Sequence, residues 1–118
     1  MTPVRGRVPR QSLPLRGEVW DAFFPQPVGE HPVVVLTSNA LIPRLAVITT
    51  VLITGTEGPA TTHIPLDSAA GVTKYPVSWV NATDIHGLPK SRLRRLKGRL
   101  SPTEMHQLEA SLRAVLVL

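Results

Sequence analysis

The chain has 118 residues, of which 42% are hydrophobic and 18% are charged, and its formal net charge is +5. This length and balance predict one globular domain rather than a disordered chain. The absence of cysteine excludes disulfides, thiolate metal sites and a cysteine nucleophile, and no apolar run approaches the roughly 18 residues that span a bilayer.

The positive charge is concentrated in two segments. Residues 1–16 contain four arginines and no acid, and residues 86–99 contain six basic residues and no acid. A concentrated positive field attracts polyanions through phosphate contacts and counterion release. A solvated face with a basic arm explains the same distribution equally well, so composition alone leaves nucleic-acid binding open.

A flexible, basic, proline-rich extension is predicted for residues 1–14, because they contain three prolines and show no apolar periodicity. The folded domain is expected over residues 15–118. The extension has arginines but no apolar segment typical of a secretory signal, so a cytoplasmic protein without a membrane partner is expected.

The next part of the chain predicts short strands separated by turns rich in proline and glycine. Strands are expected over residues 17–24, 32–37, 45–54, 62–66, 77–88 (with a turn at Gly87) and 95–100. Loops are expected over residues 25–29, 55–59 and 67–75, and a short helix over 88–93. The run from Pro32 to Thr37 lacks alternation, which predicts a strand buried on both faces, one against the core and one against a partner subunit.

The last segment predicts a helix. Ser101-Pro102-Thr103-Glu104 combines an N-cap serine, a proline at the first helical position and a glutamate at the third, which is a capping box. Helical spacing places one apolar face inward, formed by Met105, Leu108, Leu112, Val115 and Leu116. Short strands followed by one helix indicate a mostly β (α+β) fold, a small antiparallel barrel with a C-terminal helix.

A series of short segments from Leu15 to Leu118 resembles, in its order, the MazF/PemK family of toxin endoribonucleases. The segments are Arg16-Gly17-Glu18-Val19-Trp20, His31-Pro32-Val33-Val34-Val35-Leu36, Val47-Ile48-Thr49-Thr50 and Gly98-Arg99-Leu100-Ser101. The resemblance implies an SH3-like barrel and a homodimer that cuts single-stranded RNA sequence-selectively, with neither metal nor cofactor. It also implies a MazE-like antitoxin with an acidic, disordered tail.

Two other functions remain open at this point. CcdB-like gyrase inhibitors share the fold, so the chain is alternatively a non-catalytic binding protein. Binding of nucleic acid through the basic arm alone is a third hypothesis.

The resemblance implies two catalytic residues, His31 and Thr49. The family pattern has an arginine before the proline where this chain has His31, and the family's threonine matches Thr49. Histidine exchanges protons near neutral pH, whereas arginine is a fixed cation with a two-pronged donor. The exchange therefore predicts a ribonuclease with altered pH dependence, or one whose cation comes from elsewhere. An inert loop histidine is the alternative.

Four further residues are candidate RNA contacts: Arg16 as a replacement cation, and Pro32, Ser38 and Thr50 on or beside the proposed strands. The other three histidines, His63, His86 and His106, are too scattered to predict a metal site. Trp20 is expected in the core.

Overall fold

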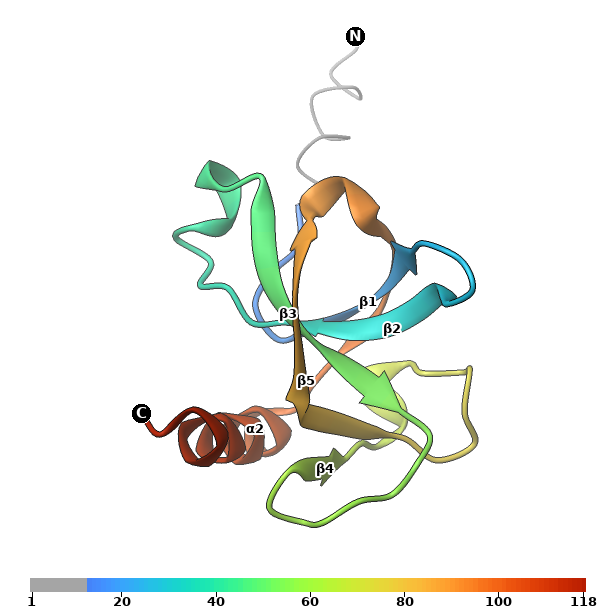
Figure 1. Ribbon diagram of the computed structural model, residues 1–118, viewed down its shortest axis with the longest axis vertical. Helices are drawn as coiled ribbons and strands as arrows, with labels where there is room; N and C mark the ends of the chain where they lie inside the picture. Colours follow the sequence, from blue (N-terminus) through green and yellow to red (C-terminus); the bar gives the residue numbers. More distant parts are fainter. Residues whose placement is uncertain (1–12) are drawn as a thin grey trace, which may run out of the picture.

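The computed structural model describes residues 13–118 (Figure 1). The extension predicted for residues 1–14 lies outside the described residues except for Leu13 and Pro14, and Pro14 is buried. None of the helices in residues 13–118 is long and apolar enough to cross a membrane.

Six strands form one antiparallel sheet in the order β4-β5-β3-β2-β1-β6. They are β1 (Glu18–Phe24), β2 (Gly29–Val35), β3 (Val47–Thr54), β4 (His63–Pro65), β5 (Trp79–Pro89) and β6 (Leu93–Arg99). Three single-turn 3₁₀ helices, η1 (Ile42–Arg44), η2 (Ser68–Ala70) and η3 (Lys90–Arg92), connect them, and α2 (Pro102–Leu116) ends the fold. The expected mostly β fold with a C-terminal helix is therefore confirmed.

The strongly bent sheet has a separate apolar cluster on each of its two faces. The helix-side core contains Val19, Val34, Val51, Ile53, Ile64, Ala70, Val80, Ala82, Leu100 and Leu108. The η1-side core contains Trp20, Ala22, Val33, Val35, Ile42, Ile48 and Leu88. Figure 1 shows α2 beside β4 and β5 at one end of the molecule and η1 at the other. Trp20 is a core residue, as predicted.

Strand β2 is buried on both faces, as its unbroken apolar run predicts. Val33, Val34 and Val35 are each fully buried, and they alternate between the two cores because successive strand side chains point to opposite faces. The expectation that a partner subunit covers one of these faces was wrong for this stretch, since the chain's own side chains cover both.

The helix begins as the sequence predicts. The Ser101 hydroxyl accepts a hydrogen bond from the Glu104 amide, and a carboxylate oxygen of Glu104 accepts one from the Ser101 amide at 2.7 Å. Leu108 is buried in the helix-side core, and Met105, Leu112 and Val115 pack against it. Leu116 is the exception to the predicted face, because it is 48% exposed.

The segment after Trp79 differs from the prediction. Strand β5 continues without a turn through Gly87 to Pro89, since residues 47–51 of β3 pair with residues 85–89. The short helix predicted over residues 88–93 is reduced to the single turn η3, and β6 begins at once with Leu93. Pairing of β6 with β1 outweighs any helical preference of this basic segment.

Candidate active site

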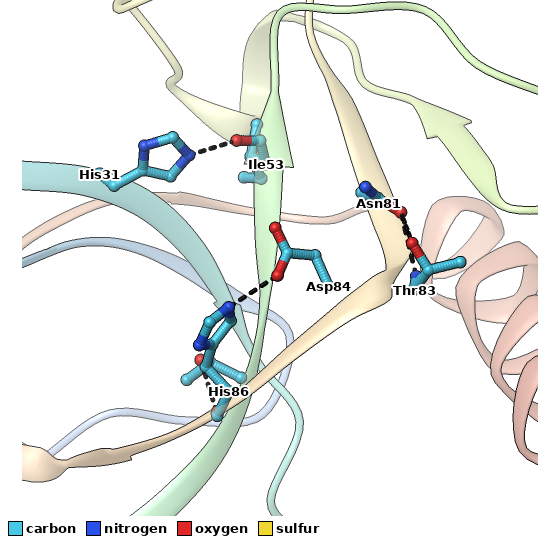
Figure 2. Close-up of polar contacts among 7 residues, drawn as sticks. His31, Ile53, Asn81, Thr83, Asp84 and His86 are labelled. Atoms are coloured by element: carbon cyan, nitrogen blue, oxygen red, sulfur yellow. Dashed lines mark hydrogen bonds and ion pairs between the residues drawn. The ribbon is translucent and has the colours of Figure 1, made fainter. Parts of the chain in front are cut away.

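His31 lies at the start of β2, directly opposite Ala22 of β1. Its imidazole Nε2 is 2.7 Å from the carbonyl oxygen of Ile53 on β3 (Figure 2). A carbonyl only accepts hydrogen bonds, so Nε2 carries the proton, and Nδ1 of the neutral ring bears a lone pair. The fold therefore fixes both the orientation and the tautomer of this imidazole.

Lys74 places a cation beside Nδ1 of His31, the nitrogen that does not bond Ile53. Its ammonium Nζ donates a hydrogen bond to the Glu30 carbonyl at 3.0 Å and lies 3.5 Å from His31 Nδ1. The neighbouring Tyr75 ring meets the His31 ring edge-on at 6.2 Å between centroids. Tyr75 covers Gly55 so closely that a Cβ there would lie 2.5 Å from the phenol ring. Contacts with β2 and with the end of β3 thus seat the loop that carries Lys74.

Burial is the main influence that lowers the pKa of His31 below its usual 6.5, and the Lys74 ammonium lowers it further. The Ile53 carbonyl and the carboxylates of Asp84 and Asp21 act in the opposite direction. Because the lowering influences outweigh the raising ones, the His31 imidazole is predominantly neutral at pH 7. A neutral imidazole is the form that accepts a proton.

A second imidazole lies close to the first. His86 on β5 donates from Nε2 to Asp84 Oδ1 at 2.6 Å (Figure 2). The Phe24 ring meets the His86 ring edge-on at 5.7 Å and the His31 ring edge-on at 6.3 Å, measured between centroids. One phenyl ring therefore contacts both imidazoles.

Within one chain, the structure does not bring Thr49 to His31. The Leu36 amide donates to the Thr49 carbonyl at 2.9 Å, so Thr49 lies opposite Leu36. His31 is five residues away on β2, which is about 17 Å along the strand at about 3.4 Å per residue. Side-chain alternation also directs Thr49 to the helix-side face and His31 to the other.

Thr54 is the threonine nearest to His31 along β3. The β2–β3 ladder ends with Val33 opposite Leu52, and counting two residues further along each strand brings His31 level with Thr54. The Ile53 carbonyl that accepts from His31 belongs to the residue just before Thr54. The Thr54 hydroxyl accepts a hydrogen bond from the Thr56 amide at 3.1 Å and is partly exposed, so its own proton remains available.

The predicted RNA contacts divide between the two ends of the sheet. Pro32 is buried beside His31. Arg16 lies at the Thr49 end, where its guanidinium donates to the Leu36 carbonyl and pairs with Glu109 at 2.9 Å. Ser38 is exposed at that same end, and its carbonyl accepts from the amides that open η1. The Thr50 hydroxyl is buried and donates to the His86 carbonyl at 3.0 Å.

The basic segment is an edge strand rather than a helical stripe. Arg92 and Arg94 lie over the Phe23 ring, at 5.7 and 5.2 Å from its centroid. Lys97 comes within 3.9 Å of the Asp21 carboxylate. Several of these charges are therefore held in place along β6, next to the strand that pairs with β2.

Residue spacing would have revealed part of the site that the sequence analysis missed. Asp84 and His86 are two apart, and on a strand this spacing puts both side chains on one face. Lys74 and Tyr75 carry no such signal, because they come from a loop without periodicity. Among residues 13–118, no three histidine or acidic side chains group as metal ligands.

The fold and the two imidazoles on β2 and β5 define a class, the small antiparallel barrels with a candidate acid–base site on one face of the sheet. A family model for the PemK-like, MazF-like toxins of type II toxin–antitoxin systems matches residues 15–116. The chain therefore belongs to this family of toxin endoribonucleases.

Individual relatives agree with this membership. A probable endoribonuclease, MazF2 of Mycobacterium tuberculosis, is 34% identical over 100 residues, which cover 84% of this chain and 94% of that protein. A mycobacterial endoribonuclease solved in complex with its cognate antitoxin is similar at 26% identity and a TM-score of 0.78, covering 89% of this chain and 96% of that one. A MazE–MazF structure from Deinococcus radiodurans shares the fold at 21% identity and a TM-score of 0.74, over 90% of this chain and 98% of that one.

Proposed function

We propose that this protein is the toxin of a type II toxin–antitoxin pair and cuts single-stranded RNA sequence-selectively without a metal ion. The family membership supports the general activity. The observation that carries the catalytic assignment is the His31 imidazole, fixed by Ile53, half-buried and next to the Lys74 ammonium. An inert loop histidine has no need of such an environment.

In the proposed reaction, the ribose 2′-hydroxyl attacks the adjacent phosphorus, and the 5′-oxygen leaves. His31 Nδ1 accepts the 2′-hydroxyl proton, because the ring is neutral and Nε2 already holds its own proton. We assign to the Lys74 ammonium, in place of Arg16, the role of offsetting charge on the phosphorane. The products are a 2′,3′-cyclic phosphate and a 5′-hydroxyl.

We assign the phosphorane hydrogen-bond donor to Thr54 in place of Thr49. Two observations support this assignment: the Ile53 carbonyl, just before Thr54, bonds His31, and the β2–β3 register continued by two residues brings Thr54 level with His31. Thr49 lies opposite Leu36, at the other end of the strand and on the opposite face. The assignment keeps the predicted chemistry, an imidazole and an alcohol from neighbouring strands at one phosphate. It changes which alcohol takes part.

The proposed partners follow from the family and from charge. The protein acts in the cytoplasm as a homodimer, and a MazE-like antitoxin covers its active site with an acidic segment. A similar endoribonuclease has been solved with its cognate antitoxin, and the basic edge strand β6 fits both an acidic peptide and an RNA backbone. The loops over residues 25–30 and 55–62 border the site and shape base preference.

A cleavage assay in excess chelator tests this proposal. Purified protein is incubated with a mixed-sequence single-stranded RNA, and the ends of the products are mapped. Cleavage to cyclic phosphates that is lost in His31→Ala supports the proposal, with His106→Ala, an exposed residue on α2, as the matched control. An intact protein that leaves every RNA uncut but inhibits a topoisomerase would replace the proposal with the gyrase-inhibitor alternative.

A further inference from the structure

The site holds a second imidazole that the reaction above does not use. His86 is 41% exposed at its side chain, and its partner Asp84 is 43% exposed. Both point to the sheet face that carries His31 (Figure 2). The Asp84 carboxylate bonds to His86 and also acts electrostatically to raise the pKa of His31.

A backbone hydrogen bond and an aromatic contact hold His86 in position. Its backbone carbonyl accepts the hydrogen bond of the buried Thr50 hydroxyl at 3.0 Å, and Thr50 is its direct partner across the β3–β5 ladder. The Phe24 ring packs edge-on against both imidazoles, which lie on the same face of the sheet. A ring held in this way loses little conformational entropy when it meets a substrate.

Asp84 also determines which nitrogen of His86 meets a substrate. A carboxylate accepts a hydrogen bond from Nε2–H, which leaves Nδ1 as the nitrogen that exchanges a proton. The same logic applies to His31, whose Nε2 is bound to the Ile53 carbonyl. In both rings, therefore, Nε2 is bound to an acceptor of the protein and Nδ1 is the nitrogen that meets a substrate.

We propose that His86 is the second proton-transfer residue of this active site, acting as general acid to His31 as general base, with Asp84 as the positioning residue that holds its ring. This inference rests on the proposed ribonuclease function and deepens it. It also gives the site the proton donor for the 5′-oxygen, which the reaction proposed above leaves unassigned.

The proton balance of the step is complete. His31 takes the proton of the 2′-hydroxyl, the O2′–P bond forms and the P–O5′ bond breaks. The leaving 5′-oxygen takes the Nδ1 proton of the His86 imidazolium, whose Nε2–H remains bonded to Asp84. His31 is then protonated and His86 neutral, and exchange with water restores both.

The test uses two RNA substrates that differ in the leaving atom. In the second substrate, sulfur replaces the bridging 5′-oxygen at the cleaved bond, and a thiolate leaves without protonation because thiols are far more acidic than alcohols. We expect His86→Ala to slow cleavage of the ordinary substrate about 100-fold, the lower range of acid–base catalysis, and the sulfur substrate only a few-fold. His31→Ala slows both, and His106→Ala slows neither.

The variant Asp84→Ala tests whether Asp84 positions the His86 ring. The measurement is the tautomer of His86, which a general loss of structure would not change in the expected way. Nitrogen NMR shifts report which imidazole nitrogen carries the proton. In spectra of the neutral ring we expect wild-type His86 to carry its proton at Nε2, and His86 in Asp84→Ala to be a mixture of tautomers, with a loss in rate smaller than that of His86→Ala. An unchanged tautomer would refute the positioning role.

The outcomes separate this inference from the proposal beneath it. One outcome is that the wild type cleaves RNA, that His31→Ala slows this cleavage, and that His86→Ala does not. In that case His86 has no catalytic role, and the proposed function stands. Equal slowing of both substrates by His86→Ala contradicts the general-acid assignment. Thermal unfolding of His86→Ala detects misfolding, and His86→Gln repeats the comparison with a different side chain. A wild type that cleaves neither substrate overturns both proposals.

Discussion

The Lys74 ammonium lies 3.5 Å from Nδ1 of His31 and 3.0 Å from the carbonyl oxygen of the preceding residue, Glu30. One loop side chain therefore links the catalytic candidate to the backbone of its own strand. The ammonium opposes protonation of His31, so it keeps the candidate base available at neutral pH.

Removal of this charge will shift the pH dependence of cleavage. Burial and Lys74 lower the pKa of His31, and activity that needs the neutral ring is lost as pH falls through that pKa. In Lys74→Gln the pKa rises, so the acidic limb of kcat/KM moves to higher pH. Arg113→Gln removes an equal charge from an exposed position on α2 and leaves the limb in place. A limb that stays or moves to lower pH in Lys74→Gln would contradict the arrangement.

Two threonines of β3 offer a matched comparison. Thr54→Val and Thr49→Val each remove a hydroxyl from the same strand and keep a β-branched side chain, so their effects on strand stability are similar. We expect Thr54→Val to lower kcat about 100-fold, as the loss of one transition-state donor does, and Thr49→Val to have a much smaller effect. The reverse order would restore the assignment made from the sequence.

Gly71 is expected to be intolerant of any side chain. Its φ of +74° is disfavoured for L residues, and a Cβ there would lie 2.0 Å from the Lys97 carbonyl oxygen. Gly71→Ala should lower the free energy of unfolding by more than about 2 kcal/mol. Gly87→Ala is the control, because its Cβ would meet Val47 at 3.4 Å, near ordinary contact. Denaturant unfolding measures both variants, and equal losses of unfolding free energy would contradict the expected intolerance at Gly71.

The buried Glu104 connects α2 to the loop before η2. One carboxylate oxygen accepts from the Ser101 amide at 2.7 Å, and the other accepts from the Asp67 amide at 2.9 Å. Glu104→Ala leaves two amides without partners and should cost about 2 kcal/mol or more of unfolding free energy.

Glu109→Ala is the matched control on the same helix. Its ion pair with Arg16 is about one-third exposed on both sides, so solvent screening limits its loss to about 1 kcal/mol. Thermal or denaturant unfolding compares the two variants, and a larger loss from Glu109→Ala would reverse this ranking of the two carboxylates.

The fold was largely predictable because its signals are local. The capping box at Ser101, the apolar run of β2 and the proline and glycine turns each depend on residues near in sequence. The turn expected at Gly87 was wrong because pairing with β3 continues through it, and a glycine in a long ladder need not end a strand.

The site was less predictable because it depends on register. The sequence singled out His31 as a candidate, but which threonine lies near it depends on the pairing of β2 with β3, and a slip of one residue reverses every face. Lys74 reaches His31 from 43 residues away through a loop without a pattern. Only Asp84 and His86 gave a local signal in the sequence, because residues two apart on a strand lie on the same face.

The proposed reaction is tested most directly by the ends of the RNA fragments that wild type and His31→Ala produce in excess chelator. We expect 2′,3′-cyclic phosphates and 5′-hydroxyls from the wild type, formed at least about 100-fold more slowly by His31→Ala. Equal rates for the two proteins, or fragments that end in 5′-phosphates, would contradict it.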